Sequence, residues 1–144
     1  MSTRIVPPIV VGVDDTPTSA AAAERAADLA RATQAPLHLV SAVEGAGAST
    51  VVTVGHDTWV DDVTSNHKQY LIDLTRDWEG VDITISCTNT SPARALTEHA
   101  EREGAEIIVV GNRRVQGASR VLGSVAGAVA RHAPCDVYVV QTTH

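Results

Sequence analysis

The 144-residue sequence contains no phenylalanine, and aromatic residues make up only 3% of it. A core without large aromatic rings must be built from Val, Ile, Leu and Ala, which suits buried parallel strands and closely packed helices. Unpaired nucleic-acid bases stack on aromatic side chains, so the sequence also has few platforms for that kind of binding. The scarcity of aromatic residues therefore favours an α/β domain and argues against a nucleic-acid-binding one.

Cysteine and positive charge are also scarce. Cys87 and Cys135 lie far apart and neither belongs to a CxxC pair, so we expect buried, reduced thiols. The formal net charge of −6 argues against binding to nucleic acid or to an anionic membrane through a basic face. No apolar run approaches the roughly 20 residues that cross a bilayer, and the first residues do not resemble a signal peptide. We therefore expect a cytoplasmic protein with no nucleic-acid or membrane partner.

Predicted strands and helices alternate along the whole chain. Apolar or alternating runs predict strands at Ile9–Val13, Leu37–Val43, Val81–Cys87, Glu106–Val110 and Asp136–Gln141. Amphipathic spacing predicts helices from Thr16 or Thr18 to Thr33, from Val60 to Trp78, from Ser91 to Gly104, and from Gly123 or Ser124 to His132. This order predicts one domain over residues 1–144, an open, mainly parallel sheet with helices on both faces.

The segment from Glu44 to Thr58 interrupts this alternation. Its composition shifts to Gly, Ala, Ser and Thr, with Val51, Val52 and Val54 as its apolar residues. Such a pattern is compatible with a short hairpin or with a flexible lid, and the residues do not decide between them.

A candidate anion site follows the fourth predicted strand. The run IIVV ends at Gly111, and a polar loop then leads to Gly123-Ser124 and an alanine-rich helix. A helix N-terminus presents unpaired N–H groups and a positive dipole end, which suits a phosphate. Ligands of parallel sheets bind beyond the carboxyl ends of the strands, where the strand order reverses. If the first and fourth strands flank that reversal, Asp14 and the Gly111 loop face each other across one crevice.

The histidines and the catalytic motifs carry less information. His56, His67, His99, His132 and His144 show no metal-ligand spacing, and we expect surface or capping roles for them. We propose no metal-ligand cluster. The sequence has no P-loop, no GxSxG elbow and no evident base for an attacking water, so we expect no efficient catalysis.

Three features together resemble the universal stress protein family over essentially the whole chain. These are the strand-ending VD before a Ser/Thr loop, the segment SPARAL at the start of the third helix, and the ending VVGN…LGSV…HAPCDVYVV. The resemblance implies a five-stranded parallel sheet in the order 3-2-1-4-5 and usually a homodimer. In one branch of the family it implies ATP, bound by a Gly-x-x-Gly motif and a later Gly followed by Ser or Thr.

Residue by residue, Gly111, Gly123 and Ser124 match that motif, whereas Arg114 replaces its second glycine and the spacer to Gly123 is one residue shorter. A residue in place of glycine costs roughly 1 to 2 kcal/mol where φ is positive. Arg113, Arg114 and Arg120 could instead contact phosphate. The nucleotide-binding residues implied are Gly12, Asp14, Thr16, Ala42, Val110, Gly111, Arg113, Arg114, Gly123, Ser124 and Val125. Asp15 adds a negative charge near the same place and would repel the phosphates of ATP unless a metal ion lies between them. Mg²⁺ would therefore accompany ATP.

Two functions follow from these patterns. The first is a stress-response protein that binds ATP or a related adenine nucleotide. The second is a dimeric interaction protein of the same fold that binds no nucleotide. In either case a last strand at the sheet edge would pair with a second copy, through Val137, Tyr138, Val139 and Val140. A phosphorylated receiver domain is excluded, because Cys87 or Thr88 and Gln141 or Thr142 stand where its Asp and Lys would be needed.

Overall fold

The computed structural model describes residues 6–14, 16–42, 50–54, 65–113 and 122–142. Its strands are β1 (Ile9–Gly12), β2 (Leu37–Ala42), β3 (Thr50–Val54), β4 (Ile83–Thr88), β5 (Ile107–Arg113) and β6 (Asp136–Thr142). Its helices are α1 (Pro17–Thr33), α2 (Ser65–Thr75), α3 (Pro92–Glu103) and α4 (Ser124–His132). Every predicted strand and helix is therefore present, although α2 ends at Thr75 rather than at Trp78.

The described strands form one sheet in the order β3-β4-β2-β1-β5-β6. All neighbouring pairs from β4 to β6 are parallel, which confirms the predicted order 3-2-1-4-5 for the five expected strands. The sixth strand, β3, pairs antiparallel with β4 at the edge and lies within the segment that the sequence left undecided. Thr50–Val54 thus adds an edge strand to the sheet beside β4.

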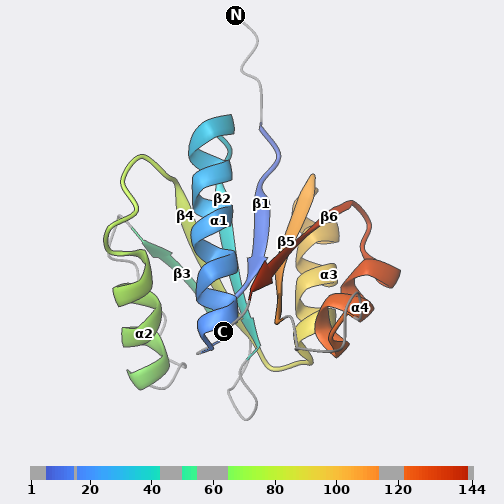
Figure 1. Ribbon diagram of the computed structural model, residues 1–144. Helices are drawn as coiled ribbons and strands as arrows, with labels where there is room; N and C mark the ends of the chain where they lie inside the picture. Colours follow the sequence, from blue (N-terminus) through green and yellow to red (C-terminus); the bar gives the residue numbers. More distant parts are fainter. Residues whose placement is uncertain (1–5, 15, 43–49, 55–64, 114–121, 143–144) are drawn as a thin grey trace, which may run out of the picture.

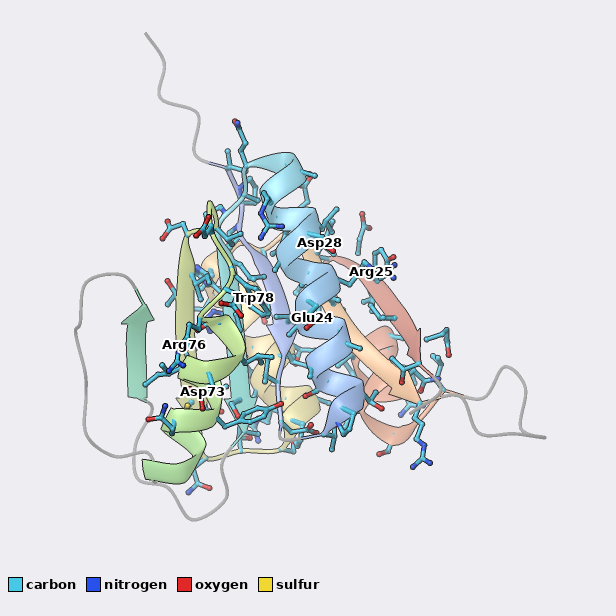
Figure 2. All side chains as sticks on the ribbon, turned by 60° about the vertical axis from the view of Figure 1, so that its left-hand side comes forward. Glu24, Arg25, Asp28, Asp73, Arg76 and Trp78 are labelled. Carbon is cyan, nitrogen blue, oxygen red and sulfur yellow. The ribbon has the colours of Figure 1, made fainter. Side chains whose placement is uncertain are left out.

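Helices cover both faces of the sheet, as Figure 1 shows for α1 and α2 on one side and α3 and α4 on the other. The face of the sheet under α1 and α2 packs against the alanines of α1. These alanines are buried because their small side chains let the helix approach the strands. Glu24, Arg25 and Asp28 project from the outer side of α1 (Figure 2). Arg25 donates to the hydroxyl of Tyr138 at 2.9 Å and so ties α1 to β6.

The ends of the helices follow local rules that the sequence predicted. Thr16 is the N-cap of α1, and its hydroxyl accepts the backbone N–H of Ser19. Gly104 is the C-cap of α3 in the left-handed conformation, which a glycine adopts without strain. The first residues of α1, α3 and α4 lie together with the carboxyl ends of β1, β2 and β5.

Two expectations about burial were wrong. Cys135 was expected to be a buried thiol but is only partly buried, whereas Cys87 is buried as expected. His99, for which a surface or capping role was expected, is only 3% exposed. It lies on α3 beside Leu96 and Ala100, on the face of the helix that packs on the sheet. Its position three residues after Leu96, on the same face of the helix, was the available signal for its burial.

Candidate functional site

A pocket with a volume of about 170 Å³ lies at the carboxyl ends of β1, β2 and β5. It sits beside the β1–β5 pair, where the order of the parallel strands reverses, as expected for an open α/β sheet. The first turns of α1, α3 and α4 contribute the rest of its wall. The lining residues are Gly12, Val13, Asp14, Thr16, Thr18, Ser19, Val40, Ala42, Pro92, Leu96, Val110, Gly111 and Val125.

Asp14 forms the polar end of the pocket. One of its carboxylate oxygens accepts both the backbone N–H of Thr16, at 2.8 Å, and the Thr16 hydroxyl. The Asp14 backbone is held in turn by Ser19, whose hydroxyl accepts the Asp14 N–H and donates to the Asp14 carbonyl. Among the residues that the structure describes, the second carboxylate oxygen has no partner. An exposed carboxylate fixed in this way can accept hydrogen bonds from the hydroxyl or amino groups of a ligand.

Gly111 brings the start of α1 close to β5. A Cβ added at this position would lie 2.7 Å from the carbonyl oxygen of Thr18 and 2.9 Å from its methyl carbon. Gly111 also lies inside β5, which continues to Arg113, and not at the strand end where the sequence placed it. The geometric reason for a glycine here is thus the approach of α1, whatever ligand the pocket holds.

The N-terminus of α4 borders the pocket through Val125. Its N-cap is Gly123, which has no side chain to cap the helix, and the N–H groups of Ser124, Val125 and Ala126 have no hydrogen-bond partner in the described part of the chain. The N–H of Gly123 is different, because it donates to the side-chain oxygen of Asn112 at 2.7 Å. The N-terminus of α4 therefore presents donors beside the pocket that no described residue occupies.

Most of the predicted site residues are brought together. Those that line the pocket are Gly12, Asp14, Thr16, Ala42, Val110, Gly111 and Val125. Arg113, Gly123 and Ser124 are exposed and are not part of its lining. Arg114 and Arg120 lie outside the described residues.

The sequence analysis missed several lining residues, namely Val13, Thr18, Ser19, Val40, Pro92 and Leu96. Pro92 and Leu96 belong to the SPARAL segment, which was read only as the start of a helix and a family feature. Val40 precedes Ala42 by two positions on β2 and therefore shares its face of the sheet. That alternation was the available signal for Val40.

A pair of histidines lies away from this pocket, between β2 and α3. His38 Nδ1 and His99 Nε2 are 2.9 Å apart, with the two rings edge to face. The Arg102 guanidinium lies 3.2 Å from His99 Nδ1. Burial lowers the pKa of His99 to about 4, helped by His38 and Arg102, and burial also lowers the pKa of His38. Both rings are therefore neutral near pH 7.

No group of three or more His, Cys, Asp or Glu side chains in the described residues could hold a metal ion. None of the described helices is long and apolar enough to cross a membrane.

Comparison with known proteins shows the family. The model of the universal stress protein family matches residues 6–141, and the chain belongs to this family. Universal stress protein YxiE of Bacillus subtilis is 26% identical, over 92% of this chain and 97% of its own length. Universal stress protein A homolog 2 of Coxiella burnetii is 30% identical, over 82% of both chains.

A solved structure extends the likeness to three dimensions. A universal stress protein crystallised in complex with cAMP is 26% identical to this chain, with a TM-score of 0.70. The alignment covers 97% of this chain and 100% of the other. The family, the fold and the order of the parallel strands therefore agree with what the sequence motifs predicted.

Proposed function

We propose that this protein binds an adenine nucleotide in the pocket at the carboxyl ends of β1, β2 and β5, as part of a stress response and without efficient catalysis. The observation that carries the proposal is that one pocket joins an apolar end, a fixed carboxylate and a helix N-terminus. A base, a sugar and a phosphate require these three environments. The relative in complex with cAMP adds support, because that ligand contains the same three parts.

The pocket suggests where each part of the nucleotide would lie. Val40, Ala42 and Leu96 form its apolar end and suit the base, whereas Asp14 suits hydroxyl or amino groups of the nucleoside. The phosphates would lie toward the first turn of α4, where the N–H groups are free. At about 170 Å³ the pocket encloses only part of such a ligand, since sites that bury whole ligands measure roughly 300 to 1,000 Å³.

ATP is one candidate for the nucleotide, and Mg²⁺ would enter with its phosphates. Because the described residues contain no metal-ligating group of three or more side chains, the phosphate oxygens would have to supply ligands to the ion. Arg113, at the exposed end of β5, and Arg114 are the candidate cations for phosphate contact. A cytoplasmic location is part of the same proposal.

The binding experiment is calorimetric titration with ATP, AMP and cAMP. We compare the wild type with Ala42→Leu, which adds bulk at the apolar end, and with Ala130→Leu, the same change at an exposed position of α4. We expect saturable binding by the wild type and Ala130→Leu, and binding weakened about tenfold or more in Ala42→Leu, because the added atoms occupy ligand space. Absence of binding by folded wild type at millimolar nucleotide, or equal binding by both variants, would contradict the proposal.

A second function, a dimeric interaction protein that binds no nucleotide, is favoured by β6. This strand lies at the edge of the sheet that the described residues form, and we infer that the backbone of Val137, Tyr138, Val139 and Val140 pairs there with a second copy. A homodimer through this edge is compatible with either function. Light scattering over a dilution series tests it, and a monomer at every concentration would remove the dimer.

A further inference from the structure

Asn112 is a buried amide beside the site to which the sequence motifs assigned no role. It lies near the end of β5, is 5% exposed, and makes hydrogen bonds in two directions. Its side-chain oxygen accepts the N–H of Gly123 at 2.7 Å, and its side-chain nitrogen donates to the Gln141 side-chain oxygen at 3.1 Å. One side chain thus joins β5, β6 and the start of α4.

This contact replaces half of a capping box. In that motif the side chain three residues into the helix reaches back to the N–H of the N-cap residue. In α4 the N-cap is Gly123 and the residue at the third position is Ala126, which has no group that could do so. Asn112 supplies the missing acceptor from the neighbouring strand. The start of α4 is therefore fixed to the sheet, while the N–H groups of its first turn stay available.

The same contact leaves little room for a side chain at position 123. A Cβ at this position would lie 3.3 Å from the side-chain oxygen of Asn112, which is closer than most such contacts allow. The backbone of Gly123 has a negative φ of −63°, so the left-handed conformation is not the reason. Asn112 and Gly123 form a matched pair, in which the small residue lets the amide approach the helix end.

We propose that Asn112 is a positioning residue for the phosphate group of the ligand. It fixes the start of α4 beside the pocket that Val125 lines, and the N–H groups of Ser124, Val125 and Ala126 have no partner among the described residues. A nucleotide then gains affinity over the corresponding nucleoside, because its phosphate meets donors that need not be ordered on binding. This inference rests on the proposed function and assigns the ligand an anionic group at this end.

The test compares the dissociation constants of adenosine and AMP for each variant by calorimetry, with thermal unfolding to confirm the fold. Asn112→Ala removes the acceptor for the Gly123 N–H. Asn112→Asp keeps that acceptor but places a negative charge beside the phosphate. Gln141→Ala is the matched control, because it removes the outer partner of Asn112 and leaves the contact with Gly123 in place.

We expect Asn112→Ala to lower the preference for AMP over adenosine about fivefold, since a net hydrogen bond is worth about 1 kcal/mol. Asn112→Asp lowers it further through charge repulsion, whereas Gln141→Ala changes it little and adenosine affinity is unchanged throughout. An unchanged preference in both Asn112 variants, or an equal loss for both ligands, overturns this inference alone. Wild type that binds neither ligand overturns the proposed function, and the inference with it.

Discussion

The buried His38–His99 pair makes the stability of the fold depend on pH in a direction that the structure determines. An arginine can only donate, so the Arg102 guanidinium 3.2 Å from His99 Nδ1 requires an unprotonated nitrogen there. The proton of neutral His99 is then on Nε2, which donates to Nδ1 of His38 at 2.9 Å. Protonating His99 would direct an N–H at the guanidinium and place a second positive charge beside it.

The size of the effect follows from the pKa of His99, which burial, together with His38 and Arg102, lowers from 6.5 to about 4, whereas Glu103 opposes the shift. The unfolded chain therefore binds the proton first as the pH falls. The contribution of His99 to the free energy of unfolding is constant above about pH 6.5 and declines between about pH 6.5 and pH 4. Since one pKa unit is worth about 1.4 kcal/mol, the full loss is about 3 kcal/mol.

Urea unfolding of the wild type and of His99→Gln at several pH values between 7.5 and 4.5 measures this loss. Glutamine can donate to His38 and accept from Arg102 but does not titrate. We expect the wild type to lose about 2.5 kcal/mol more than the variant between these limits. The carboxylates near the pair, Asp82 and Glu103, are present in both proteins, so the comparison isolates the change at position 99.

His38 needs a separate control, because burial also lowers its pKa while Glu103 and Asp82 oppose the shift. A His38→Gln variant shows how much of the pH dependence belongs to the second ring. If wild type and His99→Gln lost stability in parallel from pH 7.5 to 4.5, the burial of neutral His99 inferred from the geometry would be refuted. An NMR titration that gave His99 an ordinary pKa near 6.5 would refute it directly.

Two glycines that line the pocket should respond differently to substitution by alanine. Gly111→Ala should destabilise the fold by about 1 to 3 kcal/mol in urea unfolding, because its Cβ meets the backbone of Thr18, which cannot move without shifting α1. Gly12→Ala should cost less, about 1 kcal/mol, because its nearest contact, at 2.9 Å, is the end of the Leu96 side chain, which can adjust without a shift of backbone. Equal effects of the two variants would contradict this distinction.

The fold was largely predictable, because most of its strands are apolar runs. Such runs can be recognised as strands in the sequence without knowing which strands they pair with. β1 and β5 lie side by side, and their side chains alternate between the two cores of the sheet. β3 was not predictable in the same way. Its five residues, TVVTV, are β-branched and short, and their role depends on pairing with β4, which lies about thirty residues further along the chain. No local pattern distinguishes an added edge strand from a loop.

The site was predictable where a motif residue also lies on a pocket-facing position, as for Asp14, Ala42 and Val110. Prediction failed for Pro92 and Leu96, because their position in the pocket wall depends on how α3 crosses the sheet. Gly111 lines the pocket as expected, but an added Cβ there would meet Thr18. A motif glycine can thus be explained by helix packing alone, so its presence in a sequence is weaker evidence for phosphate binding than the matched motif suggests.

Asn112 shows what could have been inferred from the strand pattern itself. Ile108 and Val110 belong to the core under α3 and α4, and Asn112 continues the same alternation on β5. An amide placed by alternation on a buried face must find hydrogen-bond partners, and the nearest unpaired backbone groups at the end of a parallel strand are those of the next helix. The polar residue at an apolar position therefore indicates where this sheet holds the start of α4, which makes it more informative about the proposed phosphate position than Gly111 or Gly123.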